Sequence, residues 1–356
     1  MEHEKIRVIQ YGIGAIGINI VRLLLSKPNV HLVGAIDHDR LKIGRDLGDV
    51  VGLGKTLGLT IKFPPEKALN QTAADVVIHA TTAFMDQALP QIMEVLDRRI
   101  NTITIAQELF FPLGENVEKA RQIDKKSKEA GVSVIAVGIN PGFIMDAVPV
   151  LCSLPCWEIE KVSVRRVVDF SPYGPDEMTH IGAGLSPQQF LDGVKKGVIG
   201  HIGLLETAAM VARCLGICLD ELKQKKEPIV TRRRRESSFI SIQPGKVCGF
   251  RQIVAGFREE NELLNFELIG IVSPDPEEDG VELGDHARID GTPSVDITIK
   301  EEIAQKGGLA TAGVAVNMIP IVINSAPGFH TMDTWSLPHI WSDPPPKSHL
   351  IKITDF

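Results

Sequence analysis

The chain has 356 residues, of which 44% are hydrophobic and 23% are charged, as in an ordinary globular protein of about two domains. Its 45 acidic and 38 basic residues leave a formal net charge of −7 at pH 7. This charge repels a polyanion, so we expect no nucleic-acid partner.

The amino-terminal residues, MEHEKIRVIQ, run from charged side chains directly into an apolar segment, without the basic-then-apolar pattern of a secretory signal. The chain also has five cysteines, an odd number that argues against a closed disulfide framework and for a reducing compartment. We therefore expect a cytoplasmic protein.

A βαβ unit is predicted over the first 40 residues. The apolar run 6–11 predicts a strand, and apolar residues at helical spacing predict a helix that ends near Pro28. A second apolar run, 31–36, predicts a strand that ends in Asp37. Such a unit is expected to be parallel and right-handed.

The turn between the first strand and the helix has three glycines in the spacing GxGxxG. Gly12 permits the tight turn, Gly14 lets the backbone approach a pyrophosphate, and Gly17 lets the helix pack closely on the strand. The helix amino terminus then presents N–H groups to the phosphates. The sequence therefore predicts a bound dinucleotide, with contacts from Gly12, Ile13, Gly14, Ala15, Ile16 and Gly17.

Asp37 stands about 20 residues after the glycines, where the dinucleotide fingerprint has an acidic residue. Its carboxylate would accept hydrogen bonds from the adenosine ribose hydroxyls, which favours NAD. It would also oppose the 2′-phosphate of NADP, but His38, Arg40 and Arg45 stand close enough in the sequence to offset its charge. We expect the protein to use both NAD and NADP.

Strands and helices alternate along the rest of the first 150 residues. This alternation predicts an α/β fold, a Rossmann doubly wound parallel sheet that binds ligands at the carboxyl ends of its strands, in a dinucleotide-binding domain over residues 1–150. The predicted strands are 76–79, 102–106 and 132–137, and the predicted helices are 85–98 and 117–130.

After residue 150 the pattern changes to an α+β substrate and dimerisation domain, residues 151–305, with a mainly antiparallel sheet. The run Arg232 to Arg235 favours a solvated face over a phosphate-binding or interface patch. Covering the edges of such a sheet favours a homodimer. The predicted strands are 158–170, 229–242, 250–258, 263–271 and 294–299, and the predicted helices are 187–198 and 202–215.

The last part of the chain, residues 306–356, begins with an uncharged segment, 309–329, that is long enough to span a membrane. It contains Asn317, Pro320 and Asn324, which would be costly in lipid. We therefore expect no membrane association, but a buried helix that returns to the domain junction and is followed by a tail.

Two further segments follow predicted strands at the edge where a cofactor would lie. Thr81 and Thr82 are candidates for ribose or nicotinamide contacts, or else for helix caps. Asn140 stands in an Asn-Pro-Gly-Phe turn before a predicted helix holding Met145 and Asp146. Its side chain could orient the substrate or the nicotinamide carboxamide, or simply stabilise the turn.

Glu108 is the candidate catalytic residue, because it follows a buried strand and precedes apolar residues. A carboxylate in such surroundings tends to have a raised pKa, which is the condition for general acid/base catalysis near neutrality. A helix-capping or salt-bridged glutamate is the alternative. The sequence contains no HExxH or P-loop motif, and we expect no metal site.

Four segments, GIGAIG, GINPGFIMD, GHIGL at 200–204 and NMIPIVINSAPGF, resemble the 2,4-diaminopentanoate dehydrogenase and amine dehydrogenase family, which is allied to dihydrodipicolinate reductase. The resemblance implies reversible reductive amination, in which a ketone, ammonia and NAD(P)H give an amine. It also implies that Glu108, which matches the family's glutamate after the fifth Rossmann strand, is the acid/base. The His-His…Lys signature of dihydrodipicolinate reductases is missing, which disfavours that activity.

The substrate would be 2-amino-4-oxopentanoate or a plain ketone, and a carboxylate on it would require a cation such as Arg165 or Arg166. The alternatives are an alcohol-forming dehydrogenase and a non-catalytic nucleotide-binding regulator. Asn317 is a further candidate for the cofactor site, or else a helix-packing residue. Candidates for the substrate pocket are Phe143, Met145, Arg165, Tyr173, Met178, His180 and His201.

Overall fold

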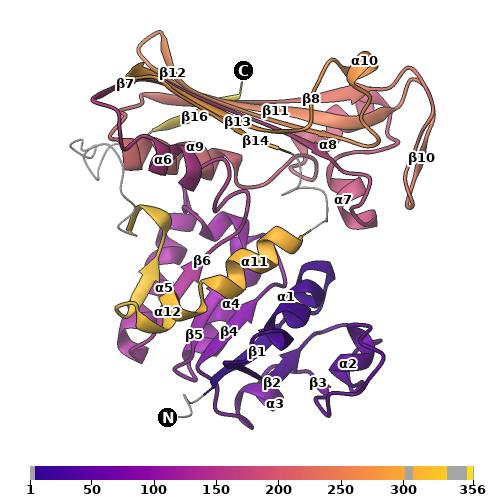
Figure 1. Ribbon diagram of the computed structural model, residues 1–356, viewed down its shortest axis with the longest axis vertical. Coiled ribbons are helices and arrows are strands. Elements are labelled where there is room, and N and C mark those ends of the chain that lie inside the picture. The colour runs from indigo at the N-terminus through magenta and orange to yellow at the C-terminus, as the bar shows by residue number, and fades with distance from the viewer. Residues whose placement is uncertain (1–4, 301–307, 335–350, 356) are drawn as a thin grey trace. The chain divides into compact units, whose positions relative to one another are not determined.

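The computed structural model describes residues 5–300, 308–334 and 351–355 (Figure 1). The chain forms two compact units, Met1–Ile139 with Gly308–Trp335 and Asn140–Gly307 with Ser336–Phe356. The predicted boundary at residue 150 therefore falls inside the second unit, and the apolar segment after Gly307 belongs to the first. Most of the predicted tail, residues 335–350, lies outside the described residues.

The first unit contains a seven-stranded sheet in which all neighbouring strands are parallel. Its order is β15-β6-β5-β4-β1-β2-β3, so the winding reverses between β1 and β4. This is the predicted Rossmann sheet, with two short strands, β3 and β15, that were not predicted. The strands are β1 (Ile6–Tyr11), β2 (Val30–Ile36), β3 (Ile61–Lys62), β4 (Val76–His79), β5 (Asn101–Thr104), β6 (Ser133–Ala136) and β15 (Gly328–His330).

Helices cover both faces of this sheet. Successive strand side chains alternate between the two layers, so Val8 packs on one side and Ile9 on the other. One face is covered by α1 (Ala15–Leu25), α11 (Leu309–Asn317) and α12 (Ile319–Asn324). The other is covered by α3 (Glu66–Leu69), α4 (Met85–Leu96) and α5 (Asn116–Ala130), while the short α2 (Leu47–Val50) follows β2.

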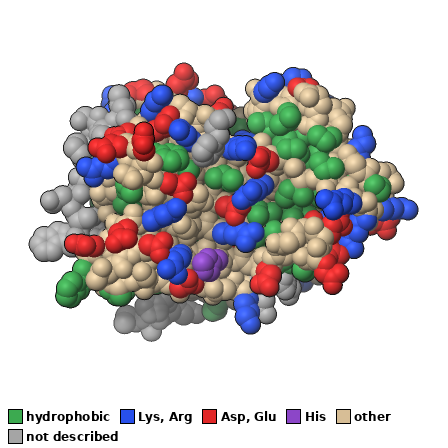
Figure 2. All heavy atoms as spheres, turned by 90° about the horizontal axis from the view of Figure 1, so that it is seen from above, with side chains coloured by type: hydrophobic (Ala, Val, Ile, Leu, Met, Phe, Trp, Pro, Cys, Tyr) green, Lys and Arg blue, Asp and Glu red, His purple; other side chains and the backbone are tan. Residues whose placement is uncertain are grey.

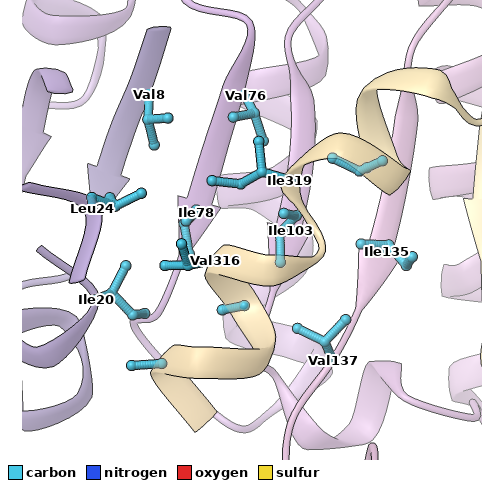
Figure 3. Close-up of a cluster of buried hydrophobic side chains, with 13 residues drawn as sticks. Val8, Ile20, Leu24, Val76, Ile78, Ile103, Ile135, Val137, Val316 and Ile319 are labelled. Carbon is cyan, nitrogen blue, oxygen red and sulfur yellow. The ribbon is translucent and has the colours of Figure 1, made fainter. Parts of the chain in front are cut away.

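The uncharged segment 309–329 forms two short helices and a strand rather than one helix. Figure 3 shows Val316 and Ile319 of this segment against the side chains of the central strands. Pro320 lies in the first turn of α12, where a missing N–H is tolerated. Within the described part of the chain, no helix combines the length and the apolar character needed to cross a bilayer.

The second unit contains another seven-stranded sheet, of order β14-β13-β7-β12-β11-β8-β16. Four neighbouring pairs are antiparallel, whereas β12 with β7 and β16 with β8 are parallel, so the sheet is mixed. The strands are β7 (Glu158–Asp169), β8 (Glu221–Val230), β11 (Val247–Arg258), β12 (Asn261–Ile271), β13 (Gly284–Thr292), β14 (Val295–Ile299) and β16 (Lys352–Asp355).

Helices pack on one face of this second sheet (Figure 1). The capping box between Ser186 and Gln189 fixes the start of α8 and agrees with the helix predicted there. The helices of this unit are α6 (Ala147–Cys152), α7 (Pro175–His180), α8 (Pro187–Lys195), α9 (Leu204–Leu215) and α10 (Pro276–Asp279).

The strand predicted over 229–242 is wrong. The structure instead places a long strand, β8, over Glu221–Val230, followed by a turn and the short ribbon of β9 (Arg235–Glu236) and β10 (Ser241–Ile242). The apolar pattern failed because polar Gln224 and Lys226 occupy inward positions of β8 and neither is exposed. Polar residues at inward positions hide a strand from a search for alternating hydrophobicity.

The prediction that the four-arginine run forms a solvated face is wrong for Arg235. Arg235 is 2% exposed, and its guanidinium donates two hydrogen bonds to the Asp279 carboxylate, at 2.8 and 2.6 Å. It also donates to the backbone carbonyl of Ser273 at 3.0 Å. A buried, paired arginine of this kind fastens the start of β9 to α10.

Candidate active site

The glycine-rich turn after β1 has a separate steric reason for each glycine. A Cβ on Gly12, whose φ is +96°, would lie 2.3 Å from the Ala80 carbonyl oxygen, and one on Gly17 would lie 2.0 Å from the Gly12 carbonyl oxygen. A Cβ on Gly14 would meet no atom within 4 Å. The first and third glycines thus serve close packing, and the second leaves open space at the start of α1.

This open space lies at the amino terminus of α1, where the first N–H groups of a helix have no carbonyl within the helix to bond. Gly14 is the N-cap, no side chain caps the helix, and Gly14 and Ala15 are exposed. The turn therefore fits a pyrophosphate, as predicted. The side chain of Ile13 is fully buried in the core, so only its backbone faces the turn.

Asp37, at the end of β2, is 5% exposed and is already engaged by the protein. Its Oδ2 accepts the Ile13 N–H at 2.7 Å and the Lys42 ammonium at 3.3 Å, and its Oδ1 accepts the Asp39 N–H at 2.8 Å. Of the predicted neighbours, Arg40 is exposed, and the His38 ring is 82% exposed with its Nδ1 3.9 Å from Asp37 Oδ1. Lys42, which sequence reasoning missed, is a lysine that pairs with Asp37 at 3.3 Å.

The loop after β4 is held by a buried polar network. The hydroxyl of Thr81 donates to Gln91 Oε1 at 2.6 Å and contacts His79 Nε2 at 2.8 Å. His79 Nδ1 lies 2.9 Å from the Thr104 hydroxyl, and burial lowers the pKa of His79 to about 4. This network fixes the loop that packs against Gly12 and uses the hydrogen-bonding groups of Thr81.

Thr82 has different hydrogen-bond partners and stabilises the start of α4. Its hydroxyl accepts the Phe84 N–H at 3.2 Å and donates to Gln87 Oε1 at 2.7 Å. This is the role of a threonine near a helix start. The contacts of Thr82 therefore support the alternative that this residue caps a helix.

Glu108 lies in a single 3₁₀ turn, η1 (Gln107–Leu109), directly after β5, and is half-buried. Its Oε2 accepts the Met85 N–H at 2.7 Å, and its own N–H donates to the Ala83 carbonyl at 3.1 Å. The carboxylate thus lies at the amino terminus of α4, where a negative charge is favoured. Lys119, which pairs with Asp86, also interacts electrostatically with Glu108.

Asn317 is at the wrong edge of the sheet for the predicted cofactor contact. It lies at the end of α11 and shares a surface pocket with Asn29 and Val30, next to the start of β2. The glycine-rich turn lies at the opposite, carboxyl edge. The reason is that α11 begins beside Ile16, at the start of α1, and runs in the same direction as that helix.

In the second unit, the Asn-Pro-Gly-Phe turn is organised by Asp146. This residue is fully buried and is the N-cap of α6, so the helix predicted to include it begins one residue later. Its carboxylate accepts the Gly142 and Ala147 N–H groups at 2.8 and 2.7 Å and the Thr207 hydroxyl at 3.3 Å. Burial raises the pKa of Asp146 to about 6, against these hydrogen bonds.

His201 precedes α9 and is held through its backbone by Gln252, which accepts its N–H at 2.9 Å and donates to its carbonyl at 3.1 Å. Burial, then the charges of Arg166 and Lys226, lower the pKa of His201 to about 4, although a hydrogen bond to the Asn140 backbone acts in the opposite direction. The imidazole is therefore neutral at physiological pH. Among the described residues, neither its Nδ1 nor the side-chain oxygen of Asn140 has a hydrogen-bond partner, and both atoms are buried.

The structure separates the two neighbouring arginines of β7, either of which was predicted as a cation for a substrate carboxylate. Arg165 is exposed and binds Glu267 at 2.8 Å, and Glu267 also pairs with Arg251. The view in Figure 2 shows a face on which acidic and basic side chains are interspersed in this way. Arg166 points to the covered face of the sheet, where its Nη1 lies 2.7 Å from Asp285 Oδ1.

The remaining predicted pocket residues differ in exposure. Met145 is fully buried, Met178 is 5% exposed, and Phe143 is 39% exposed. Tyr173 packs its ring on Phe170 at a centroid distance of 4.9 Å, and burial raises the pKa of its hydroxyl. His180 is exposed, and its backbone carbonyl accepts the Gly200 N–H at 2.9 Å.

Known proteins resemble the chain over almost its whole length. Residues 6–103 match the dihydrodipicolinate reductase N-terminus model, and residues 143–348 match the model of the 2,4-diaminopentanoate dehydrogenase C-terminal domain. The 2,4-diaminopentanoate dehydrogenase of Acetoanaerobium sticklandii is 35% identical over 92% of this chain and 93% of its own. The amine dehydrogenase of Streptomyces virginiae is 26% identical over 91% and 94%.

Solved structures agree with this result. The amine dehydrogenase from Mycobacterium smegmatis superposes with a TM-score of 0.83 at 25% identity, over 96% of this chain and 98% of that one. A dihydrodipicolinate reductase from Paenisporosarcina shares the fold, with a TM-score of 0.51 at 14% identity.

The fold, the glycine-rich turn and these relatives define the class of the protein, which is an NAD(P)-dependent dehydrogenase. One family model matches more than half of the chain, and the relative at 35% identity is covered almost completely. The chain belongs to the 2,4-diaminopentanoate dehydrogenase family.

Proposed function

We propose that the protein catalyses the reversible oxidative deamination of an amine. In the deaminating direction the protonated amine, NAD(P)⁺ and water give a ketone, ammonium, NAD(P)H and a proton. The observation that carries the proposal is the position of Glu108, a half-buried carboxylate at the carboxyl end of β5 in the nucleotide-binding unit. The relatives of the protein that are named 2,4-diaminopentanoate dehydrogenase and amine dehydrogenase support the same chemistry.

We assign the acid/base role to Glu108. The Met85 N–H occupies Oε2, so Oε1 is the oxygen that would exchange protons with the substrate nitrogen and the attacking water. The negative charge would also stabilise the cationic iminium of the substrate. Bound NAD(P) supplies the hydride acceptor or donor, and the turn of Gly12 to Gly17, with Asp37, would hold it.

Asn140, His201 and Arg166 are proposed to bind the polar groups of the substrate. Two of them present buried atoms without a described partner, Asn140 Oδ1 and His201 Nδ1, and a neutral imidazole can accept a hydrogen bond from an amine. Arg166 and Lys226 both act on His201, which favours a substrate that carries a carboxylate, such as 2-amino-4-oxopentanoate. Phe143, Met145, Tyr173 and Met178 would supply the less polar walls.

The deciding experiment follows the oxidation of NADH and NADPH with a panel of ketones, with and without ammonium. We expect turnover only with ammonium, and faster turnover with the carboxylate-bearing ketone than with a plain ketone of equal length. Turnover that does not need ammonium would replace the proposal by an alcohol-forming dehydrogenase. Cofactor binding with no turnover of any ketone or amine would favour a regulatory protein.

Variants of two glutamates that are near each other in the sequence test whether the Glu108 carboxylate acts in catalysis or whether the loss of any negative charge in this region lowers activity. Glu108→Gln should bind NAD(P) as the wild type does but lose about two to four orders of magnitude in kcat, the usual contribution of an acid/base group. Glu115→Gln, an exposed residue beside α5, is the matched control and should keep full activity. Equal activity of both variants would remove Glu108 from the mechanism.

We also propose that the protein is a cytoplasmic homodimer. The second sheet ends in β14 and β16, each paired on one side only within the described chain, and a second copy could cover such an edge. The five free cysteines fit a reducing compartment. Sedimentation analysis of the purified protein tests the dimer directly, and a monomer at micromolar concentration would contradict it.

A further inference from the structure

The turn after β2 places an ammonium group beside Asp37, the residue predicted to bind the cofactor ribose. The backbone N–H of Lys42 donates to the backbone carbonyl of Asp39 at 2.9 Å, and this hydrogen bond closes the turn. The Lys42 ammonium then lies 3.3 Å from Asp37 Oδ2 and 3.4 Å from Asp39 Oδ2. Its side chain is 25% exposed, so this cation reaches the surface of the nucleotide-binding unit.

Asp37 itself has little capacity left for a ligand. A carboxylate has about four lone-pair positions. At Asp37, the Ile13 N–H and Lys42 use Oδ2, and the Asp39 N–H uses Oδ1, so about one position on Oδ1 stays open for a ribose hydroxyl. The carboxylate is therefore suited to one hydroxyl. It cannot bind the oxygen atoms of a phosphate, because these are hydrogen-bond acceptors and an ionised carboxylate has no hydrogen to donate.

From this arrangement we infer that Lys42 is the residue that binds the 2′-phosphate of NADP. Its ammonium has three N–H donors and neighbours the position of the ribose hydroxyl. With NAD it stays on Asp37 and Asp39; with NADP it turns toward the phosphate, and Asp39 is left exposed enough to be solvated. The dual use of cofactors thus depends on one lysine rather than on His38 or Arg40.

The test compares the affinities for NAD and NADP without turnover, by isothermal titration calorimetry. Lys42→Met should weaken NADP binding about tenfold or more, as expected for the loss of one charge-assisted hydrogen bond, and change NAD binding less than about threefold. Lys27→Met, the same change at the opposite edge of the sheet, is the control and should alter neither affinity. Equal weakening for both cofactors in Lys42→Met would overturn the inference.

A second comparison separates direct contact from mere neutralisation of Asp37. If Lys42 acted only by neutralising Asp37, then Asp37→Asn in the Lys42→Met background would restore NADP binding. We expect no restoration, while Lys42→Arg should retain NADP binding because it keeps the charge. Restoration in the double variant would contradict the assignment. Because only binding is measured, the outcome does not depend on the proposed amine chemistry.

Discussion

The backbone N–H of Met85 donates to Glu108 Oε2 at 2.7 Å, and this contact ties the proposed acid/base to the first turn of α4. Glu108 is therefore both a helix cap and a candidate catalyst, which the sequence presented as alternatives. The two roles use different parts of one carboxylate and can be separated by mutation.

Glu108→Ala should lower the free energy of unfolding by about 1 kcal/mol, because the Met85 N–H loses its acceptor. Glu108→Gln retains an acceptor oxygen and should unfold within about 0.5 kcal/mol of the wild type. Urea unfolding of both variants measures the difference. Equal stability of the two would show that the contact with Met85 contributes nothing to α4.

The glycine-rich turn predicts opposite phenotypes for two of its glycines. Gly14→Ala adds a methyl group that meets no protein atom, so the melting temperature should not change, but affinity for NAD should fall at least about tenfold because the methyl enters the phosphate space. In Gly17→Ala the added Cβ would lie 2.0 Å from the Gly12 carbonyl oxygen, so this variant should have a melting temperature that is lower by several degrees. Unchanged NAD binding in Gly14→Ala would contradict this use of the turn.

The neighbouring arginines of β7 should differ in their effect on stability. Arg166→Met leaves Asp285 buried without its partner, in a place where burial already raises the pKa of that carboxyl, and should cost about 3–5 kcal/mol. Arg165→Met removes an exposed pair and should cost less than about 1 kcal/mol. Chemical denaturation of the two variants under one condition measures this difference in the free energy of unfolding. Similar losses of stability in both variants would mean that Arg166 is not buried as described.

His79 should make the stability of the protein depend on pH in acid. Its pKa is about 4 in the folded chain and 6.5 as a free side chain, so the unfolded state binds more protons between these values. Stability is complete above pH 6.5 and falls as the pH drops to 4, by roughly 3 kcal/mol for this residue. His79→Gln should flatten this decline, whereas the exposed His31→Gln should not. Identical pH profiles for wild type and His79→Gln would count against a buried neutral imidazole.

The amino-terminal half could be predicted closely because its signals are local. A glycine spacing, an acidic residue at a strand end and short apolar runs specify a turn and buried parallel strands within a few residues of chain. The predicted strand 76–79 and the start of the helix at Met85 agree with β4 and α4. Glu108 was identified for the same reason, since it directly follows one of these strands.

The substrate side and the fine structure of the cofactor side required the tertiary structure. Alternation along β7 places Arg165 and Arg166 on opposite faces, but only the packing of helices on one face decides which arginine is buried. Likewise, the direction of α11 decides that Asn317 lies at the amino edge of the sheet, and the fold of the turn after β2 brings Lys42 to Asp37. The sequence by itself determined the nucleotide-binding fold and its glycines, because local spacing is enough for a turn. Which polar side chains meet was decided by contacts between segments far apart in the chain or by turn geometry, which spacing does not encode.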